Sequence, residues 1–106
     1  MDKKEIAGKV IKLCKESKAE IQNVSLSQLH NLRTLVKRTQ VVDEIKIYLD
    51  YQSAREDAVK KFFEKIKNEL ENMEREGLSR EDLKYFIGNL VRYAYSMIKE
   101  KKEVKE

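Results

Sequence analysis

The residues best suited to chemistry in this sequence lie in a basic stretch without carboxylates. Residues 22–41 contain no Asp or Glu, although 40% of the 106 residues are charged. On a helix, residues three and four apart share a face, so this stretch would present one basic face. That face carries His30, Arg33, Thr34, Lys37 and Arg38. Arg33 and Lys37 are four residues apart and repel each other mildly unless an anion lies between them, and phosphate oxygens are the obvious candidates.

Residues for catalysis are scarce. His30 is the only histidine, which excludes a metal site with two histidine ligands. Cys14 is the only cysteine and lies on an apolar stripe, so we expect a buried, unreactive thiol. The sequence has no glycine-rich phosphate loop, no H-E-x-x-H and no C-x-x-C motif. We therefore expect a noncatalytic protein without a metal or another cofactor.

Length and charge distribution indicate one small domain with a polyanion-facing surface. A chain of 106 residues without proline and with three glycines is expected to form a single domain, residues 1–106. The first 42 residues have a net charge of +5, and the remaining 64 have a net charge of −1. This asymmetry favours an anionic partner, while solvated faces rich in Lys and Glu are the plainer interpretation. No segment is apolar enough to span a membrane, and the N-terminus lacks an apolar signal core, so we expect a cytoplasmic protein.

Hydrophobic periodicity predicts an all-α fold, a compact bundle of about five helices. The first helix is expected at about residues 2–22. Ser25 and Gln28 have the spacing of a capping box, so a second helix is expected from there to about residue 40. The apolar residues Leu29, Leu32, Leu35 and Val36 fall on the side of this helix opposite the basic face.

The pattern leaves one boundary open, between a third helix that begins near Val41 and a fourth at about residues 57–75. Ser53 and Glu56 have the spacing of another capping box, yet nothing between these helices forbids a continuous helix. The sequence is therefore compatible with two helices or with one long, fused helix.

The last helix is marked by clear boundary signals. Gly77 is the expected C-terminal stop of the fourth helix, and Ser79 is the expected N-cap of the fifth. Residues 102–106 follow the last apolar positions, so we expect them to fray.

Three short motifs lie on successive predicted helices: LSQLHNL at residues 26–32, IKIYLDYQSARE at residues 45–56 and YFIGNLVRYA at residues 85–94. Their order resembles the small helical subunit of type III-A CRISPR–Cas (Csm) interference complexes, over about residues 24–99. In that family the first block usually reads S-K-L-R-N-L, the second ends Y-x-A-G-R-E and the third reads E-A-L-V-A-Y. The matching residues here are Ser27, Leu29, Asn31 and Leu32, then Tyr51, Arg55 and Glu56, then Leu90, Val91 and Tyr93.

The sequence also departs from the family pattern. Gln28 and His30 stand where the family usually has Lys and Arg, so part of its basic surface is weakened or displaced here. Ala54 replaces a glycine that favours a break, which makes fusion of the third and fourth helices more favourable.

The resemblance implies a scaffold role without active-site chemistry. In the family, several copies stack into a filament beside the guide-binding subunits and help to hold the guide RNA and target RNA, while other subunits cleave. We accordingly predict RNA-backbone binding, independent of sequence, by Arg33, Lys37, Arg38, Arg55, His30 and Asn31. The predicted partners are guide RNA, target RNA, other subunits of the Csm complex and further copies of this chain. The alternative is a helical protein-interaction adaptor or regulator whose basic face meets an acidic partner, and an enzyme is least favoured.

Overall fold

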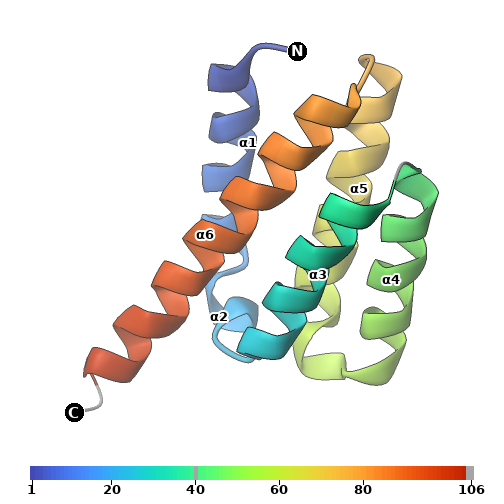
Figure 1. Ribbon diagram of the computed structural model, residues 1–106. Helices are drawn as coiled ribbons and strands as arrows, with labels where there is room; N and C mark the ends of the chain where they lie inside the picture. Colours follow the sequence, from blue (N-terminus) through green and yellow to red (C-terminus); the bar gives the residue numbers. More distant parts are fainter. Residues whose placement is uncertain (40, 105–106) are drawn as a thin grey trace.

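In a computed structural model, the described residues of the chain fold into six α-helices and one turn of 3-10 helix (Figure 1). The structure describes residues 1–39 and 41–104, with side chains as far as residue 100. The helices are α1 (Lys3–Glu16), α2 (Lys18–Ile21), α3 (Leu26–Arg38), α4 (Val42–Arg55), the 3-10 helix η1 (Asp57–Val59), α5 (Lys60–Arg75) and α6 (Arg80–Val104). No strand occurs in the described ranges, so the predicted all-α bundle is confirmed.

The longest helix, α6, organises one side of the bundle. It runs diagonally across the molecule, with α1 packed on one flank and α3 on the other (Figure 1). On the other side, α4 packs mainly against α5. The helix pairs α3–α4 and α4–α5 are antiparallel, so the beginning of α3 lies at the same end of the molecule as the end of α4 (Figure 1). In the part of the chain that the structure describes, no helix is long and apolar enough to cross a membrane.

The apolar stripes of the helices meet in one core. Its buried members are Ile6, Val10, Leu13 and Cys14 of α1, Ile21 of α2, Leu29, Leu32 and Val36 of α3, Ile45 and Leu49 of α4, Phe62, Phe63, Ile66, Leu70 and Met73 of α5, and Leu83, Phe86, Ile87, Leu90, Val91, Ala94, Met97 and Ile98 of α6. The rings of Phe62 and Phe63 lie 5.5 Å apart between centroids. Cys14 is buried as expected, and burial raises the pKa of its thiol to about 12.

The first predicted helix is divided in two, which the periodicity did not indicate. Ser17, at the break between α1 and α2, has a non-helical backbone with φ −110° and ψ 19°. Its side chain is buried, and its hydroxyl has no hydrogen-bond partner in the described structure. Ser17 occupies a position of the apolar stripe, so the sequence keeps the spacing of a continuous helix. Serine nevertheless weakens a helix locally, because its side chain competes for backbone hydrogen bonds.

The alternative of a fused third and fourth helix is wrong. Glu56 has an extended backbone, with φ −135° and ψ 111°, and η1 follows it and leads into α5. The capping box that the spacing of Ser53 and Glu56 allowed does not form, because the Ser53 hydroxyl donates to the Leu49 carbonyl at 2.9 Å. The break brings Phe62 and Phe63 into the core, whereas a straight helix would carry them away from it.

The other boundary signals are confirmed, although residues 102–106 are described only in part. Gly77 ends α5 with a φ of +93°. Ser79 accepts the Asp82 N–H and Asp82 accepts the Ser79 N–H, each at 3.1 Å. The hydrogen bond from the Ser79 N–H is the largest of the effects that hold the pKa of the Asp82 carboxyl below its usual range. Where fraying was expected, α6 continues to Val104, and residues 105 and 106 lie outside the described residues.

Two glycine substitutions with opposite effects test this backbone geometry. Gly77→Ala should lower the free energy of unfolding by about 1–2 kcal/mol, because L-residues resist a positive φ. Gly8→Ala, in the exposed interior of α1, should raise it by about 0.5–1 kcal/mol. Urea unfolding followed by circular dichroism measures both changes. Changes of the same sign in the two variants would contradict the assigned backbone.

Candidate nucleic-acid interface

The rotation of α3 about its axis decides which side chains reach solvent. Leu29, Leu32 and Val36 are buried, and Leu35 is half-buried. Of the residues predicted on the opposite side, His30, Arg33, Lys37 and Arg38 are exposed, whereas Thr34 is half-buried. Asn31, a further predicted site residue, is also exposed. We call the five exposed residues the α3 basic face. Their exposure confirms the predicted amphipathic helix, while RNA binding by them stays a prediction.

Hydrogen bonds with α4 hold the beginning of α3 in place. The predicted capping box is confirmed, since the Ser25 hydroxyl accepts the Gln28 N–H at 3.0 Å and the Gln28 side chain accepts the Ser25 N–H at 2.9 Å. The Gln28 amide also donates to Oε1 of Gln52 at 2.9 Å. The Tyr48 hydroxyl donates to the Gln28 carbonyl at 3.1 Å. Gln28 therefore joins the N-terminal turn of α3 to the second half of α4.

The end of α3 is held in a similar way. The Thr39 N–H donates to the Leu35 carbonyl at 2.9 Å and closes the last turn. The Thr39 hydroxyl lies 2.7 Å from a carboxylate oxygen of Glu44 in α4. With both ends attached to α4, the outward direction of the α3 basic face is fixed.

Gln28 has a structural role at the N-terminal turn of α3. Its side chain is only 7% exposed and is fully engaged with Ser25 and Gln52. This position therefore adds nothing to the basic surface. His30 is exposed on the α3 basic face.

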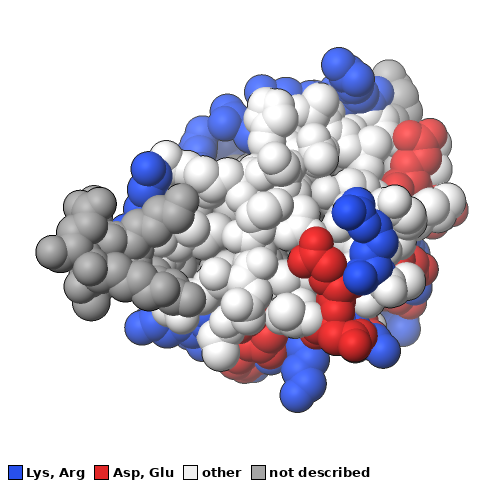
Figure 2. Space-filling view, turned by 90° about the horizontal axis from the view of Figure 1, so that it is seen from below, with Lys and Arg blue, Asp and Glu red and all other residues white. Residues whose placement is uncertain are grey.

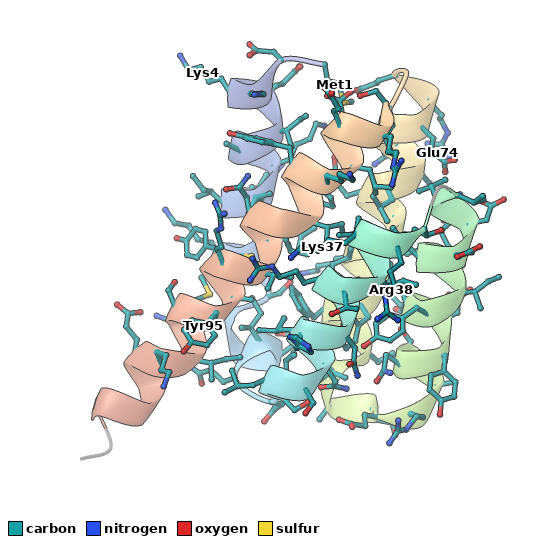
Figure 3. All side chains as sticks on the ribbon, in the orientation of Figure 1. Met1, Lys4, Lys37, Arg38, Glu74 and Tyr95 are labelled. Atoms are coloured by element: carbon teal, nitrogen blue, oxygen red, sulfur yellow. The ribbon has the colours of Figure 1, made fainter. Side chains whose placement is uncertain are left out.

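The six predicted site residues form a strip and not a pocket. Figure 3 shows Lys37 on the side of α3 toward α6, and Arg38 on the side toward α4. Arg55 comes from the end of α4 and lies near the beginning of α3, because these helices are antiparallel. Asn31 and Arg38 are separated by about 10 Å along the helix axis. On α3 the strip therefore runs from His30 to the end of the helix at Arg38, and Arg55 lies beside the first turns of α3.

Arg55 and Asn31 both influence the Tyr48 hydroxyl. Burial raises the pKa of the Tyr48 hydroxyl, and this effect is opposed by the positive charge of Arg55 and by a hydrogen bond with the Asn31 side chain. The Arg55 guanidinium also lies over the ring of Tyr51, 5.5 Å from its centroid. Such a contact orients the guanidinium while leaving its N–H donors free for an anion.

The cations of this strip have no carboxylate partner. Within the described ranges, Arg33, Lys37, Arg38 and Arg55 form no ion pair. Elsewhere, by contrast, ion pairs connect helices: Lys9 with Glu69 at 2.9 Å, Lys67 with Asp50 at 2.9 Å, and Lys46 with Glu74. The acid-free stretch thus leaves the charges of the strip available to an external anion.

The end of the molecule where α3 begins and α4 ends has a largely uncharged surface. Figure 2 shows an uncharged region in the middle of this end, with Lys and Arg side chains along its upper edge. Ser25, Leu26 and Ser27, at the beginning of α3, are exposed there.

No group of three His, Cys, Asp or Glu residues suited to hold a metal occurs in the part of the chain that is described.

The residues that position the strip were not predicted from the sequence. Neither Tyr48 nor Gln52 was assigned a role in positioning α3. Their partner Gln28 is 20 and 24 residues away in sequence, so helical periodicity carries no signal for these contacts.

Comparisons with protein-family models, curated proteins and solved structures found no match to this chain. Its function must therefore be inferred from the geometry of the strip and from the order of the sequence motifs.

Gln28→Ala tests the connection between α3 and α4. The change removes half of the capping box and leaves the buried Gln52 oxygen without its donor, so the free energy of unfolding should fall by about 1–3 kcal/mol. Ser27→Ala, at an exposed neighbouring position, is the control and should stay within about 0.5 kcal/mol of the wild type. Equal unfolding free energies for the two variants would show that Gln28 does not hold α3.

Proposed function

We propose that this chain is a noncatalytic, RNA-backbone-binding scaffold subunit of a type III-A CRISPR–Cas effector complex, which lies along the guide RNA and target RNA. The observation that carries the proposal is the strip formed by the α3 basic face and Arg55, exposed and without ion pairs in the described structure. The order of the three motifs, which resembles the Csm small subunit, supports it.

The chemistry of the strip suits phosphates better than bases. Arg33 and Lys37 are one helical turn apart, about 6 Å along the axis, and both side chains are long and solvated. Lys and Arg bind phosphate oxygens without reading sequence, and Arg adds paired N–H donors. His30 and Asn31 add hydrogen-bonding groups that suit sugar or phosphate oxygens.

The placement of carboxylates agrees with this proposal. A carboxylate on the outer side of α3 would repel an RNA backbone. In α4 and α5, carboxylates instead pair with lysines, as Asp50 does with Lys67 and Glu74 does with Lys46. Exposed ion pairs add little stability, so the stability of the fold does not explain why α3 lacks acidic residues.

The outer side of α4 provides a surface for protein partners. Ile47 is 69% exposed and Tyr51 is 56% exposed, and they lie one helical turn apart. Further copies of this chain and other subunits of the complex are the proposed occupants. The same two residues also suit the alternative function, a helical adaptor whose basic face meets an acidic protein.

Charge reversal on the strip tests RNA binding. The variant Lys37→Glu, Arg38→Glu, Arg55→Ala should bind single-stranded RNA of any sequence more weakly than the wild type. Its dependence of log affinity on log salt concentration should be flatter by about 0.7 for each phosphate that the variant no longer binds. Fluorescence anisotropy with a labelled RNA at several salt concentrations measures both quantities.

A matched variant controls for net charge. Lys15→Glu, Lys18→Glu, Lys61→Ala makes the same charge change at exposed lysines on α1, α2 and α5. It should keep most of the RNA affinity. If both triple variants bind RNA equally well, the strip is not the binding surface. If the strip variant binds RNA as tightly as the wild type, the adaptor function is favoured.

Ile47→Lys tests the protein-contact surface. The wild type should self-associate at high micromolar concentration, and the variant should remain monomeric, because a lysine makes burial of this position costly. Val41→Lys changes another exposed apolar residue and should leave self-association intact. Analytical ultracentrifugation that finds a monomeric wild type would exclude association through this surface.

A further inference from the structure

A groove between α1 and α6 collects cations and aromatic rings outside the strip. It consists of two adjoining depressions of about 560 and 340 Å³. Both volumes lie within the range of about 300–1,000 Å³ that is usual for ligand sites. The residues of the larger depression that matter here are Lys3, Lys84, Tyr85, Gly88, Asn89 and Arg92. The smaller one shares Asn89 and Arg92 and adds Ile11 and Tyr93.

The charge of the groove favours an anion. Lys3, Lys84 and Arg92 line the larger depression, where Glu81 is the one carboxylate. None of the three cations forms an ion pair in the described structure. Because Lys84 and Arg92 are two helical turns apart on α6, they offer two anchoring points about 12 Å apart along the helix axis.

Two tyrosines give the groove aromatic surfaces. Nζ of Lys3 lies 5.6 Å from the centroid of the Tyr85 ring, so this ring presents a face that a flexible lysine covers. A base that takes the place of Lys3 on the ring would leave the ammonium free to bind a phosphate. Tyr93, half-buried in the second depression, lies two helical turns further along α6.

Asn89 lies between the tyrosines with one polar atom uncommitted. Its amide nitrogen donates to the Tyr85 carbonyl at 2.8 Å, which fixes the orientation of the side chain. No donor in the described structure reaches its Oδ1, which can accept a hydrogen bond from a base.

Gly88 leaves open space beside these groups. A Cβ added at Gly88 would have no atom within 4 Å other than those of its own helix and chain neighbours, so a side chain there would extend into the groove. Gly8, on α1, is also helical with open space around it, and it does not line either depression.

We propose that the α1–α6 groove is a second binding site, for single-stranded RNA, that stacks bases on Tyr85 and Tyr93 and holds phosphates with Lys3, Lys84 and Arg92. The combination of ring faces, cations and a free amide oxygen matches a nucleotide. Asn89 and Arg92 line both depressions, and two further cations line the larger one, so the groove as a whole suits an anionic ligand better than the apolar face of a helix. This proposal extends the proposed RNA-binding function but depends on residues outside the strip.

Gly88→Gln tests the groove by filling it. Anisotropy with a short labelled oligoadenylate should show affinity reduced by about tenfold, a loss within the range expected when one base no longer stacks. Gly8→Gln should bind as the wild type does. Both variants should melt at or above the wild-type temperature, since glutamine is the better helix former. Equal oligoadenylate affinity for the two variants would overturn the proposal.

Tyr85→Leu separates stacking from charge. This variant keeps an apolar side chain in place of the ring, so it should lose oligoadenylate affinity and retain wild-type affinity for inorganic polyphosphate, which has no bases. Loss of affinity for both ligands by the same factor, or for neither, would overturn the stacking role.

The two proposed RNA sites fail in different ways. If only the strip is wrong, the Lys37→Glu, Arg38→Glu, Arg55→Ala variant binds oligoadenylate like the wild type while Gly88→Gln still weakens binding. If only the groove is wrong, the triple variant loses affinity and Gly88→Gln does not. A wild-type chain that binds no oligoadenylate at low salt overturns both.

Discussion

Burial of the apolar side of α3 is the constraint on which the proposed function depends. Leu29, Leu32 and Val36 lie in the core, and full burial of each such side chain is worth about 1.5–3 kcal/mol. An exposed ion pair is worth only about 0–1 kcal/mol. Core packing therefore decides the rotation of α3, and the charges on its other side have no competing influence. The residues that face water are free to serve a partner.

Attachment to α4 makes this orientation stable at both ends of the helix. The Gln28 network joins the beginning of α3 to Tyr48 and Gln52, and Thr39 joins its end to Glu44. These bonds also place Arg55 beside the first turns of α3. As a result, the strip combines residues from two helices whose relative position is set by buried contacts.

The α1–α6 groove depends on a different packing contact. Because α6 packs against both α1 and α3, the groove lies on one flank of α6 and α3 lies on the other (Figure 1). In the groove, two rings and an amide lie beside three cations, whereas the strip is a row of exposed cations in which the Arg55 guanidinium already covers Tyr51. We therefore propose base and phosphate contacts for the groove and phosphate contacts alone for the strip.

The sequence predicted local features well and tertiary contacts poorly. The Ser25–Gln28 capping box, the stop at Gly77 and the outward side of α3 follow from residues close together in the chain, and all are confirmed. The separation of α4 from α5 is decided by which residues must reach the core, and local spacing allowed both outcomes. The groove was missed because it joins Lys3 to Tyr85, which are 82 residues apart.

The affinity of the wild-type chain for single-stranded RNA as a function of salt tests the central claim most directly. For two RNAs of equal length and unrelated sequence, the affinities should agree within a few-fold. The logarithm of affinity should fall linearly with the logarithm of salt concentration, and the four cations of the strip should contribute about −3 to the slope if each contacts a phosphate. Affinity independent of salt, or undetectable at low salt, would contradict the claim that this chain binds the RNA backbone.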